Sequence, residues 1–340
     1  MKISHASHPL IRMTDCGLFC EEGNFYIDPV RGPVQHAVIT HGHSDHARGV
    51  SNFYYATSMS EPILRKRLGC DIDLTLTDYG DTITLGTTKV SFHPAGHILG
   101  SAQIRVEANG EVWVVTGDFK RDHDPTCAPF EVVPCDTLIS EATFALPIYR
   151  WKPARDVALE ILRWWEKNIS EQQVSVLFCY ALGKAQRVLA ELASLTDRSV
   201  LLHGAVVPIT EIYREAGVQM LPTSKVDLQT KHDYSGEMII APPSAAGSLW
   251  MRRFKRAQTG FCSGWMRVRG QRRRRGYDRG FVLSDHADWP SLLQTLSESQ
   301  ARHIQLHHGY SDILVRYLCE QGVHAEGLGA PFAEMESDPE

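Results

Sequence analysis

The sequence predicts an α/β protein in which a strand-rich outer part encloses an inserted layer of alternating strands and helices. Three observations support this fold class. Residues 24–118 read as short strands separated by turns. Residues 174–242 alternate between apolar strand patterns and helical patterns, which favours a parallel sheet. Residues 280–321 then return to strand–helix units, so we expect the insert to lie between 150 and 280.

The outer part is expected to begin with short strands and one helix. The helix is predicted near 59–68, from the pattern MSEPILRKRL. Asn109 and Gly110 are a strong signal for a two-residue hairpin turn between two strands. The strands expected here are 24–28, 36–40, 81–85, 89–93, 102–107 and 111–118.

The insert is expected to open with a helix from Pro153 to about Lys167. Four apolar residues of this helix are spaced for one buried face. They are Val157, Ile161, Leu162 and Trp165. The elements that follow are strands 174–180, 200–204 and 237–242 and helices 183–195 and 208–216.

The chain is expected to return to the outer part after the insert. The elements predicted there are strands 280–286 and 303–309 and helices 290–299 and 311–321. We therefore expect an outer domain at 1–150, the insert at 151–280, the return of the outer domain at 281–330 and a C-terminal tail at 331–340.

The composition is that of an ordinary globular protein. Apolar residues make up 43% of the 340 residues and charged residues make up 22%. No stretch approaches the roughly 20 apolar residues that a membrane helix needs, and the N-terminus shows no secretory signal pattern. The eight cysteines are scattered, and the closest pair is Cys16 and Cys20. We expect a cytoplasmic protein with free thiols and no membrane contact.

The charge of the chain is unevenly distributed. The net charge is −5, yet the segment from Arg252 to Arg279 holds eleven Arg or Lys residues and one acid, Asp278. A local basic strip can bind phosphates on an acidic protein. The same run, RGQRRRRG, is equally typical of a solvated loop, so the strip leaves both interpretations open.

The strongest chemical signal is the motif HGHSDH, from His41 to His46, directly after an expected strand. Imidazoles at this density in a core would leave ring nitrogens without partners. In a tight loop, alternate residues can point to two different centres. His41 and His43 are therefore expected to hold one metal ion, and Asp45 and His46 a neighbouring ion. Imidazole with carboxylate suits zinc, and also manganese or iron.

Further ligands lie at the ends of predicted strands. His97 lies in a glycine-rich turn, and Asp118 ends the strand EVWVVTGD, where its carboxylate can bridge both ions. Near the C-terminus, His307 and His308 end the strand expected at 303–309. Adjacent strand residues face opposite ways, so only one of these two is expected to be a ligand.

These residues resemble the ligand pattern of the metallo-β-lactamase superfamily, in which an acidic residue such as Asp28 in YIDP precedes the motif. Further strings resemble its β-CASP nucleic-acid branch. Glu141 in ISEATF looks like motif A, His286 in FVLSDHADW looks like motif B, and His308 in LHHG looks like motif C. The strings CYALGKAQRV, SGWM and SDHADW are most similar to the bacterial ligase-associated DNA exonucleases, which are Artemis-type relatives. The resemblance covers roughly residues 10–325.

The resemblance implies a metallo-β-lactamase αββα sandwich with an inserted α/β domain of the β-CASP type. It also implies two divalent metal ions, zinc in the first place and manganese as the alternative. The two ligand sets that it implies are His41, His43, His97 and Asp118 for one ion, and Asp45, His46, Asp118 and His308 for the other.

The expected activity is hydrolysis of DNA phosphodiester bonds by a two-metal hydroxide mechanism, as a repair exonuclease that acts on 5′ ends. Asp45 is expected to orient the attacking water as well as to bind metal. His286 is expected to contact the scissile phosphate or to protonate the departing oxygen. Asp28 and Glu141 are expected to accept hydrogen bonds that fix histidine tautomers.

Substrate contacts are expected from the insert. Gly183 and Lys184 open a predicted helix, whose N-terminus suits a terminal phosphate, and Lys184 would add a full charge. Four arginines of the basic strip would follow the backbone of the nucleic acid; they are Arg272, Arg273, Arg274 and Arg275. The aromatic residues between the charges either stack on bases or belong to a core; they are Trp250, Phe254, Phe261 and Trp265.

Three other functions compete with a DNA exonuclease. An RNA-processing β-CASP ribonuclease would use the same fold and is the main alternative. Hydrolysis of a small lactam or thioester is disfavoured by the insert and the basic strip. A catalytically silent nucleic-acid-binding subunit is disfavoured because no expected metal ligand is missing. The family resemblance also implies a functional association with a DNA ligase or a helicase.

Overall fold

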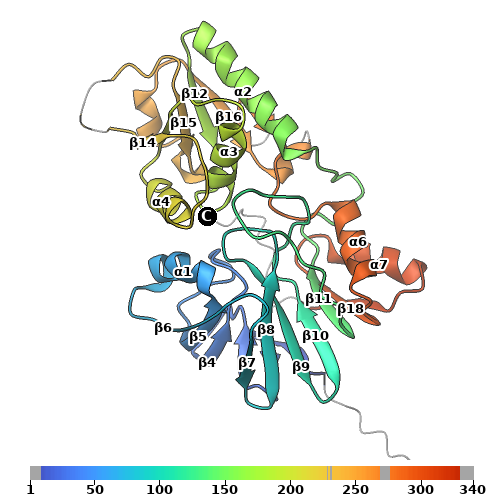
Figure 1. The fold of residues 1–340 in the computed structure, drawn as a ribbon. Coiled ribbons are helices and arrows are strands. Elements are labelled where there is room, and N and C mark those ends of the chain that lie inside the picture. The colour runs from blue at the N-terminus through green and yellow to red at the C-terminus, as the bar shows by residue number, and fades with distance from the viewer. Residues whose placement is uncertain (1–8, 228, 230–231, 269–275, 330–340) are drawn as a thin grey trace, which may run out of the picture.

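The computed structural model describes residues 9–227, 229, 232–268 and 276–329, and it holds three β-sheets with flanking helices (Figure 1). Two sheets lie together in the lower half of Figure 1, and the third occupies the upper half. The protein is therefore an α/β protein, as the sequence predicts. The C-terminal tail expected at 331–340 lies outside the described residues.

The first sheet is formed by the N-terminal strands in sequence order. Its members are β1 (Ile11–Thr14), β2 (Gly17–Cys20), β3 (Phe25–Ile27), β4 (Val34–Val38), β5 (Ser51–Thr57) and β6 (Asp73–Thr77). The pairs β1–β2 and β2–β3 are antiparallel, whereas β3, β4, β5 and β6 run parallel. Because parallel strands end at one edge, the residues that follow β3 and β4 lie close together.

The second sheet combines strands from distant parts of the chain. In spatial order they are β19 (Ala325–Gly327), β18 (His303–His307), β11 (Thr137–Glu141), β10 (Glu111–Val115), β9 (Ala102–Ala108), β8 (Thr88–Pro94) and β7 (Thr82–Leu85). The strands β10, β11 and β18 are parallel neighbours, and Glu141 pairs with His307. The ends of these three strands therefore meet at one edge of the sheet.

The third sheet is entirely parallel. In spatial order its strands are β14 (Thr223–Lys225), β13 (Val200–Leu202), β15 (Met238–Ala241), β12 (Val174–Phe178), β16 (Ala257–Cys262) and β17 (Arg279–Phe281). Parallel sheets are covered on both faces, so their central strands are apolar throughout. Accordingly, every residue of β12 and β15 is buried.

Helices cover these sheets. The α-helices are α1 (Glu61–Leu68), α2 (Ala154–Ser170), α3 (Lys184–Ala193), α4 (Val207–Glu215), α6 (Trp289–Glu298) and α7 (Ser311–Glu320). Short 3-10 segments are η1 (Ser58–Ser60), η2 (Pro243–Ala245), η3 (Leu249–Arg253) and η4 (Gly264–Arg267). None of the helices in the described part of the chain is long and apolar enough to cross a membrane.

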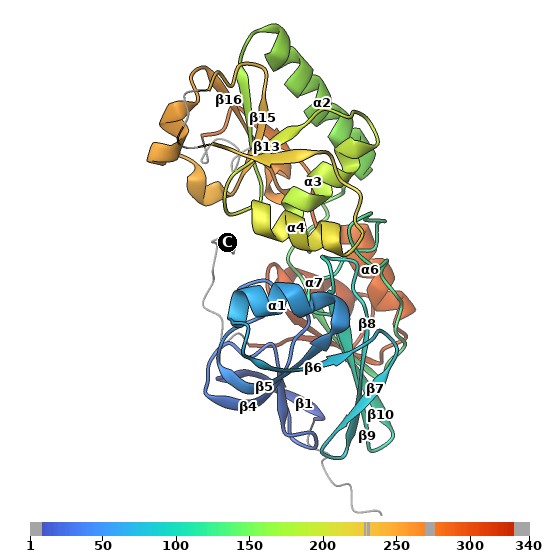
Figure 2. The same cartoon turned by 60° about the vertical axis from the view of Figure 1, so that its left-hand side comes forward.

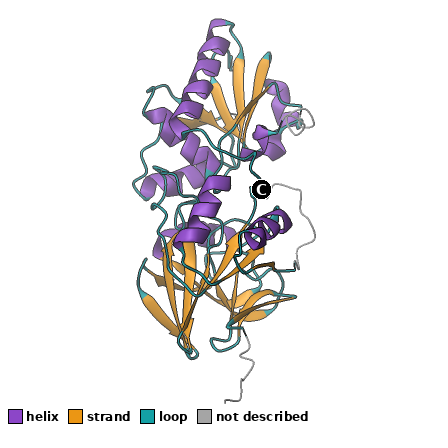
Figure 3. Cartoon of the chain, turned by 90° about the vertical axis from the view of Figure 1, so that its right-hand side faces the viewer, coloured by secondary structure: helices purple, strands orange, loops and turns teal. Residues whose placement is uncertain are grey.

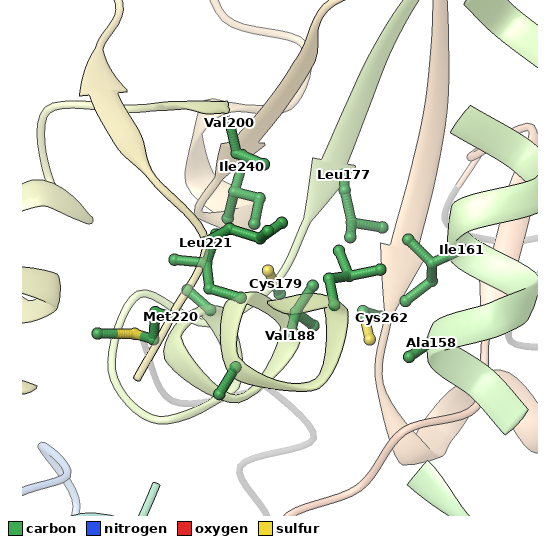
Figure 4. Packing of buried hydrophobic residues seen from close by; sticks show 14 of the residues in the cluster. Ala158, Ile161, Leu177, Cys179, Val188, Val200, Met220, Leu221, Ile240 and Cys262 are labelled. Atoms are coloured by element: carbon green, nitrogen blue, oxygen red, sulfur yellow. The ribbon is translucent and has the colours of Figure 1, made fainter. Parts of the chain in front are cut away.

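Separate apolar cores support the layers. One core lies between the first two sheets and includes Phe25 and Phe92. Another packs the second sheet against α6 and α7. In the upper layer, Ile161 of α2 and Val188 of α3 meet Leu177 of β12 (Figure 4).

The aromatic rings of the basic segment belong mainly to the core on the other side of β12. Phe254 and Phe261 are buried there, and Trp250 and Trp265 pack against it half-buried. Of the two interpretations that the sequence left open, the core is therefore correct for Phe254 and Phe261.

The upper and lower layers meet through helices. In Figure 2, α4 lies directly above α1, and the two helices are in contact. Figure 3 shows the strands as a lower group and an upper group with helices between them. The loop between β12 and α3 also contacts the lower layer, because the carbonyl oxygen of Leu182 lies 3.3 Å from Nε2 of His43.

Several strands differ from the sequence-based expectation. The strand expected at 280–286 ends at Phe281 and lies in the third sheet, because Ser284 and Asp285 turn away to take part in buried polar contacts. Strands without a clear alternating pattern were missed; they are β1, β2, β5, β6, β11, β14, β16 and β19. The hairpin at Asn109-Gly110 is confirmed, because both residues have positive φ angles and join the antiparallel pair β9–β10.

Candidate metal centre

The motif HGHSDH forms the loop that leaves the end of β4. Asp28, which follows β3, fixes the start of this loop because its carboxylate accepts hydrogen bonds from the backbone N–H (2.8 Å) and the hydroxyl of Thr40. Gly42 allows a close approach to α1, since a Cβ at this position would lie 2.4 Å from Cγ2 of Ile63. The side chains on either side of Gly42 point toward each other, with Nε2 of His41 3.0 Å from Nδ1 of His43.

Three ring nitrogens meet at this point. His41 Nε2 and His97 Nε2 each lie 3.0 Å from His43 Nδ1. Asp118 Oδ2 lies 3.6 Å from His41 Nε2 and 3.7 Å from His97 Nε2. All four ligand atoms lie within 4.8 Å of one another. The structure thus brings together the first expected ligand set.

The chemistry of this cluster fits a bound cation. Burial, as the largest cause, lowers the pKa of His41, His43 and His97, so these rings are neutral and offer lone pairs. Burial alone would raise the pKa of Asp118, but the charges of His46 and His286 bring it well below its usual range. Neutral imidazoles beside an ionised carboxylate are the donors that zinc and similar divalent ions take.

The second expected set is less tightly gathered. His46 Nε2 lies 3.5 Å from Asp118 Oδ2 and 3.7 Å from Asp45 Oδ2, and the rings of His46 and His308 have centroids 6.0 Å apart. Among the described residues, the second group with all ligand atoms within 4.8 Å is instead Asp118, Glu141 and His286. The buried Oδ1 of Asp45 has no hydrogen-bond partner, which leaves it available to a cation. Binding of a metal by this set stays a prediction.

His307 and His308 both approach this second set. They line one small cavity together with Asp45 and His46. His307 is the last residue of β18 and pairs with Glu141, whereas His308 has a positive φ of 61° that turns it out of the strand. The choice of His308 as the ligand stays a prediction.

Asp28 and Glu141 each hold one histidine by a direct hydrogen bond. His46 Nδ1 lies 2.7 Å from Asp28 Oδ2, and His286 Nδ1 lies 2.8 Å from Glu141 Oε2. The other oxygen of Glu141 accepts from the backbone N–H of Phe119 at 2.7 Å. In each pair, the carboxylate leaves Nε2 of the ring directed toward Asp118.

The environment of His286 differs from that of the four clustered ligands. Burial by itself would lower its pKa, but the charges of Glu141 and Asp118 and the hydrogen bond that Glu141 accepts from His286 Nδ1 raise the pKa to about 9. His286 Nε2 lies 4.0 Å from Asp118 Oδ2, beside the first ligand set. The imidazole is thus well placed to donate a hydrogen bond to a group held there.

Lys184 does not lie where a phosphate-binding residue is expected. Its side chain is only 3% exposed, and Nζ lies 2.6 Å from Asp285 Oδ2. The carboxylate of Asp285 already balances the positive charge of the ammonium group, and burial separates the ammonium group from solvent. The position of Lys184 therefore does not support the prediction that it binds substrate. Its partner Asp285 is distant in the chain, so no local residue pattern indicates the pair.

The basic strip is only partly described. Arg272, Arg273, Arg274 and Arg275 lie outside the described residues. Elsewhere in the strip, Arg252, Lys255 and Arg256 are exposed, and Arg267 is exposed with Nε donating to the carbonyl of Ile148.

Sequence reasoning missed several residues that surround the cluster. Thr40 contacts His41, Leu182 contacts His43, and the carbonyl of Asp285 contacts His97. Arg187 donates to the carbonyl of Ser284, the residue before Asp285. A weak signal was present for Asp285, which immediately precedes His286. Leu182 acts through its carbonyl group, which no residue pattern reveals.

Comparison with known proteins supports a nucleic-acid enzyme lineage. The chain is 30% identical over 316 residues to a protein of Opitutus terrae named "Probable DNA ligase". The matched region covers 92% of this chain and 30% of that protein. The chain is 26% identical over 237 residues to a ribonuclease of Thermus thermophilus, which covers 60% of this chain and 52% of the relative. The chain thus spans about a third to a half of the length of these relatives. No family model matches the chain.

A solved structure shares the fold. A protein of unknown function from Enterococcus faecalis superposes with a TM-score of 0.60 and 12% identity, over 88% of this chain and 80% of the other. This likeness concerns the arrangement of the chain alone. The motif HGHSDH, the convergence of its histidines with His97 and Asp118, and the relatives by sequence support a likeness to the β-CASP branch of the metallo-β-lactamase superfamily.

Proposed function

We propose that this chain is a metal-dependent nuclease that hydrolyses phosphodiester bonds in DNA, as an exonuclease that acts on 5′ ends in DNA repair. One observation carries the proposal. The cluster of His41, His43, His97 and Asp118 lies directly beside the pair formed by His286 and Glu141, and Asp118 Oδ2 is close to both groups. A metal site with a separate hydrogen-bond donor at its side suits cleavage of a phosphodiester.

Each part of this site has a task in the proposed reaction. Two divalent ions, when bound, lower the pKa of water and neutralise charge on the phosphoryl oxygens. Asp118 is shared by both ligand sets, and Asp45 orients the attacking water. Glu141 accepts from His286 Nδ1, so that Nε2 contacts the scissile phosphate or delivers a proton to the departing oxygen. Asp28 holds His46 in the tautomer that leaves Nε2 free for metal.

The finer features of the protein belong to the same proposal. In this proposal, 1–150 and 281–330 are the two parts of a metallo-β-lactamase αββα sandwich, and 151–280 is the inserted β-CASP domain. Zinc is the proposed metal, with manganese as the alternative, and the cytoplasm is the proposed location. The match to a longer protein named a DNA ligase supports a functional association with a ligase, and a helicase is a second candidate partner.

A ribonuclease is the second candidate function. The likeness to the Thermus thermophilus ribonuclease favours it, because that relative spans 60% of this chain. Both candidates use the same metal centre and recognise mainly phosphate, so the site itself does not favour one nucleic acid over the other.

Digestion of end-labelled substrates tests the proposal. Single-stranded and double-stranded DNA and RNA, each with and without a 5′ phosphate, are incubated with the metal-loaded protein. We expect DNA to be shortened from its 5′ end, and His43→Ala to abolish this cleavage because a ligand of the first metal is lost. The matched control is His324→Ala, which removes an exposed imidazole that stacks on His303.

Each result separates the alternatives. Preferential cleavage of RNA would replace the DNA exonuclease with the ribonuclease. Full activity of a folded His43→Ala variant would contradict the metal mechanism, whichever nucleic acid is cut.

A further inference from the structure

We propose that the segment Leu182–Arg187, at the start of α3, positions the imidazoles of His43 and His97, so that binding of the first metal ion depends on how the third-sheet layer docks. The proposal rests on the proposed function, because it concerns the ligands of that ion. It gives Lys184 and Arg187 a positioning role in place of contact with substrate.

Leu182 is the contact to His43. Its carbonyl oxygen lies 3.3 Å from His43 Nε2, while His43 Nδ1 faces the cluster. If Nδ1 held the metal ion, Nε2 would carry the proton and would donate it to the carbonyl of Leu182. An acceptor at the outer nitrogen fixes both the tautomer and the rotation of a ligating ring.

Gln186 holds this carbonyl in place. Its side chain is fully buried and accepts from the backbone N–H of Gly183 at 2.8 Å. Its amide nitrogen donates to the carbonyl of Ala181 at 3.0 Å and to the hydroxyl of Thr210 at 3.1 Å. The backbone is thus tied down on both sides of Leu182 by one residue.

Gly183 brings the same loop against the turn that carries His97. It has a φ of +85°, and a Cβ at this position would lie 2.5 Å from Cγ2 of Ile98, the residue after His97. At this loop, the upper layer therefore contacts the cluster through the backbone of Leu182 and Gly183 and not through a metal-binding side chain.

Asp285 is the contact to His97. Its carbonyl oxygen accepts from His97 Nδ1 at 2.8 Å, which leaves Nε2 facing His43. Its own carboxylate is held by α3, because Lys184 Nζ lies 2.6 Å from Oδ2 and a terminal nitrogen of Arg187 lies 3.4 Å from Oδ1. The same Arg187 nitrogen donates to the carbonyl of Ser284 at 2.8 Å.

These charges are enclosed, so their geometry is constrained. Lys184 is 3% exposed, and Arg187 and Asp285 are exposed by 1% and 4%. Arg187 Nε also lies 3.1 Å from Asp124, and Lys120 Nζ donates to the carbonyl of Ser284 at 2.6 Å. Removing one partner of a buried pair leaves the other charge uncompensated. Loss of Lys184 would leave Oδ2 of Asp285 without its partner, while Arg187 stays beside Oδ1. We therefore expect the backbone of Asp285, on which His97 depends, to shift.

Metal binding by the metal-free protein is the direct test. Lys184→Met and Gln186→Ala are titrated with zinc against a chelating dye, and the absorption spectrum of bound cobalt reports the coordination geometry. We expect one of the two ions to bind about 10- to 100-fold more weakly in both variants, with an altered cobalt spectrum. Lys167→Met is the matched control, because this lysine of α2 is 68% exposed.

A conservative variant separates positioning from packing. Lys184→Arg keeps the charge beside Asp285 and should restore most of the affinity, whereas Lys184→Met should not. Should Lys184→Met fail to fold, Gln186→Ala decides, since it leaves every buried charge paired. Unchanged metal affinity and cobalt spectra in these variants would overturn the positioning role alone. If the unmodified protein takes up no divalent metal, the proposed function fails as well.

Discussion

One carboxylate oxygen, Oδ2 of Asp118, lies between 3.5 and 4.0 Å from ring nitrogens of four histidines. Three of these histidines belong to the expected ligand sets, and the fourth is His286. The pKa directions divide these four histidines differently. Burial lowers the pKa of His41 and His97. Burial also acts to lower the pKa of His46 and His286, but nearby carboxylates raise both, chiefly Asp118 for His46 and Glu141 for His286. The two rings with a raised pKa are those whose Nδ1 contacts a carboxylate, Asp28 for His46 and Glu141 for His286.

Replacing His286 should separate catalysis from metal binding. In His286→Ala the proposed donor is lost while the first ligand set stays intact, so we expect kcat to fall about 10²- to 10⁴-fold. The metal content measured by elemental analysis should not change.

The control for this variant is His324→Ala, which should keep the full rate. Loss of a metal ion from His286→Ala would show that His286 is a ligand, in agreement with its grouping with Asp118 and Glu141.

At the scale of elements, the turn after β18 determines where His308 lies. Gly309 has a φ of +55°, and a Cβ there would lie 2.3 Å from the carbonyl oxygen of Ala142, which follows β11. The same carbonyl accepts from the backbone N–H of Tyr310 at 2.9 Å. The close approach of two backbones thus links motif C to motif A.

Gly309→Ala should be much more damaging than an alanine at an open glycine. We expect a loss of about 2–5 kcal/mol of unfolding free energy, from the left-handed backbone together with the clash against backbone atoms. Chemical denaturation measures this loss, and zinc titration should show weaker binding at the site of His308.

Gly322 provides the comparison for this variant. It also has a positive φ, of +79°, but its missing Cβ would meet nothing within 4 Å. Gly322→Ala should therefore cost only about 1–2 kcal/mol. Equal losses in the two variants would contradict the importance of the contact with Ala142.

The elements that the sequence predicts well are those with a strong local pattern. Asn109-Gly110 marks its hairpin, and the spacing of Val157, Ile161 and Trp165 marks the buried face of α2. Strand β16 was missed because AQTGFC has no alternation and becomes a strand only through pairing with β12 and β17. Pairing with strands that are distant in the sequence determines whether such segments become strands, and a single sequence does not reveal that pairing.

The same distinction applies to the site. The motif HGHSDH is a local pattern, so four of its residues could be selected from the sequence. The pair of Lys184 with Asp285 joins residues that are far apart in the chain, and a lysine after glycine is more typical of a surface position. The contacts of Leu182 are made by backbone, which carries no signal in the residue type.

At the scale of the whole molecule, removal of metal should leave the fold intact. Each layer has its own apolar core, and the clustered imidazoles are neutral when buried. We expect the chelated protein to keep its circular dichroism spectrum while its thermal midpoint falls. Metal at 100 times its dissociation constant should contribute about 2.7 kcal/mol.

Thermal unfolding with and without a chelator, followed by zinc addition, measures this contribution. Global unfolding at room temperature on chelation would show that the cores alone do not support the fold, and that the metals are structural.

The pairing of Thr137 with His303 has a consequence for the order in which the protein is made. β11 is synthesised before the upper layer and β18 after it, so the two strands can pair only when the whole upper layer has been made. During that interval His41, His43, His97 and Asp118 are already present, but Asp285, His286 and His308 are not. A growing chain therefore holds all four residues of the first ligand set well before it has the residues proposed to complete the centre.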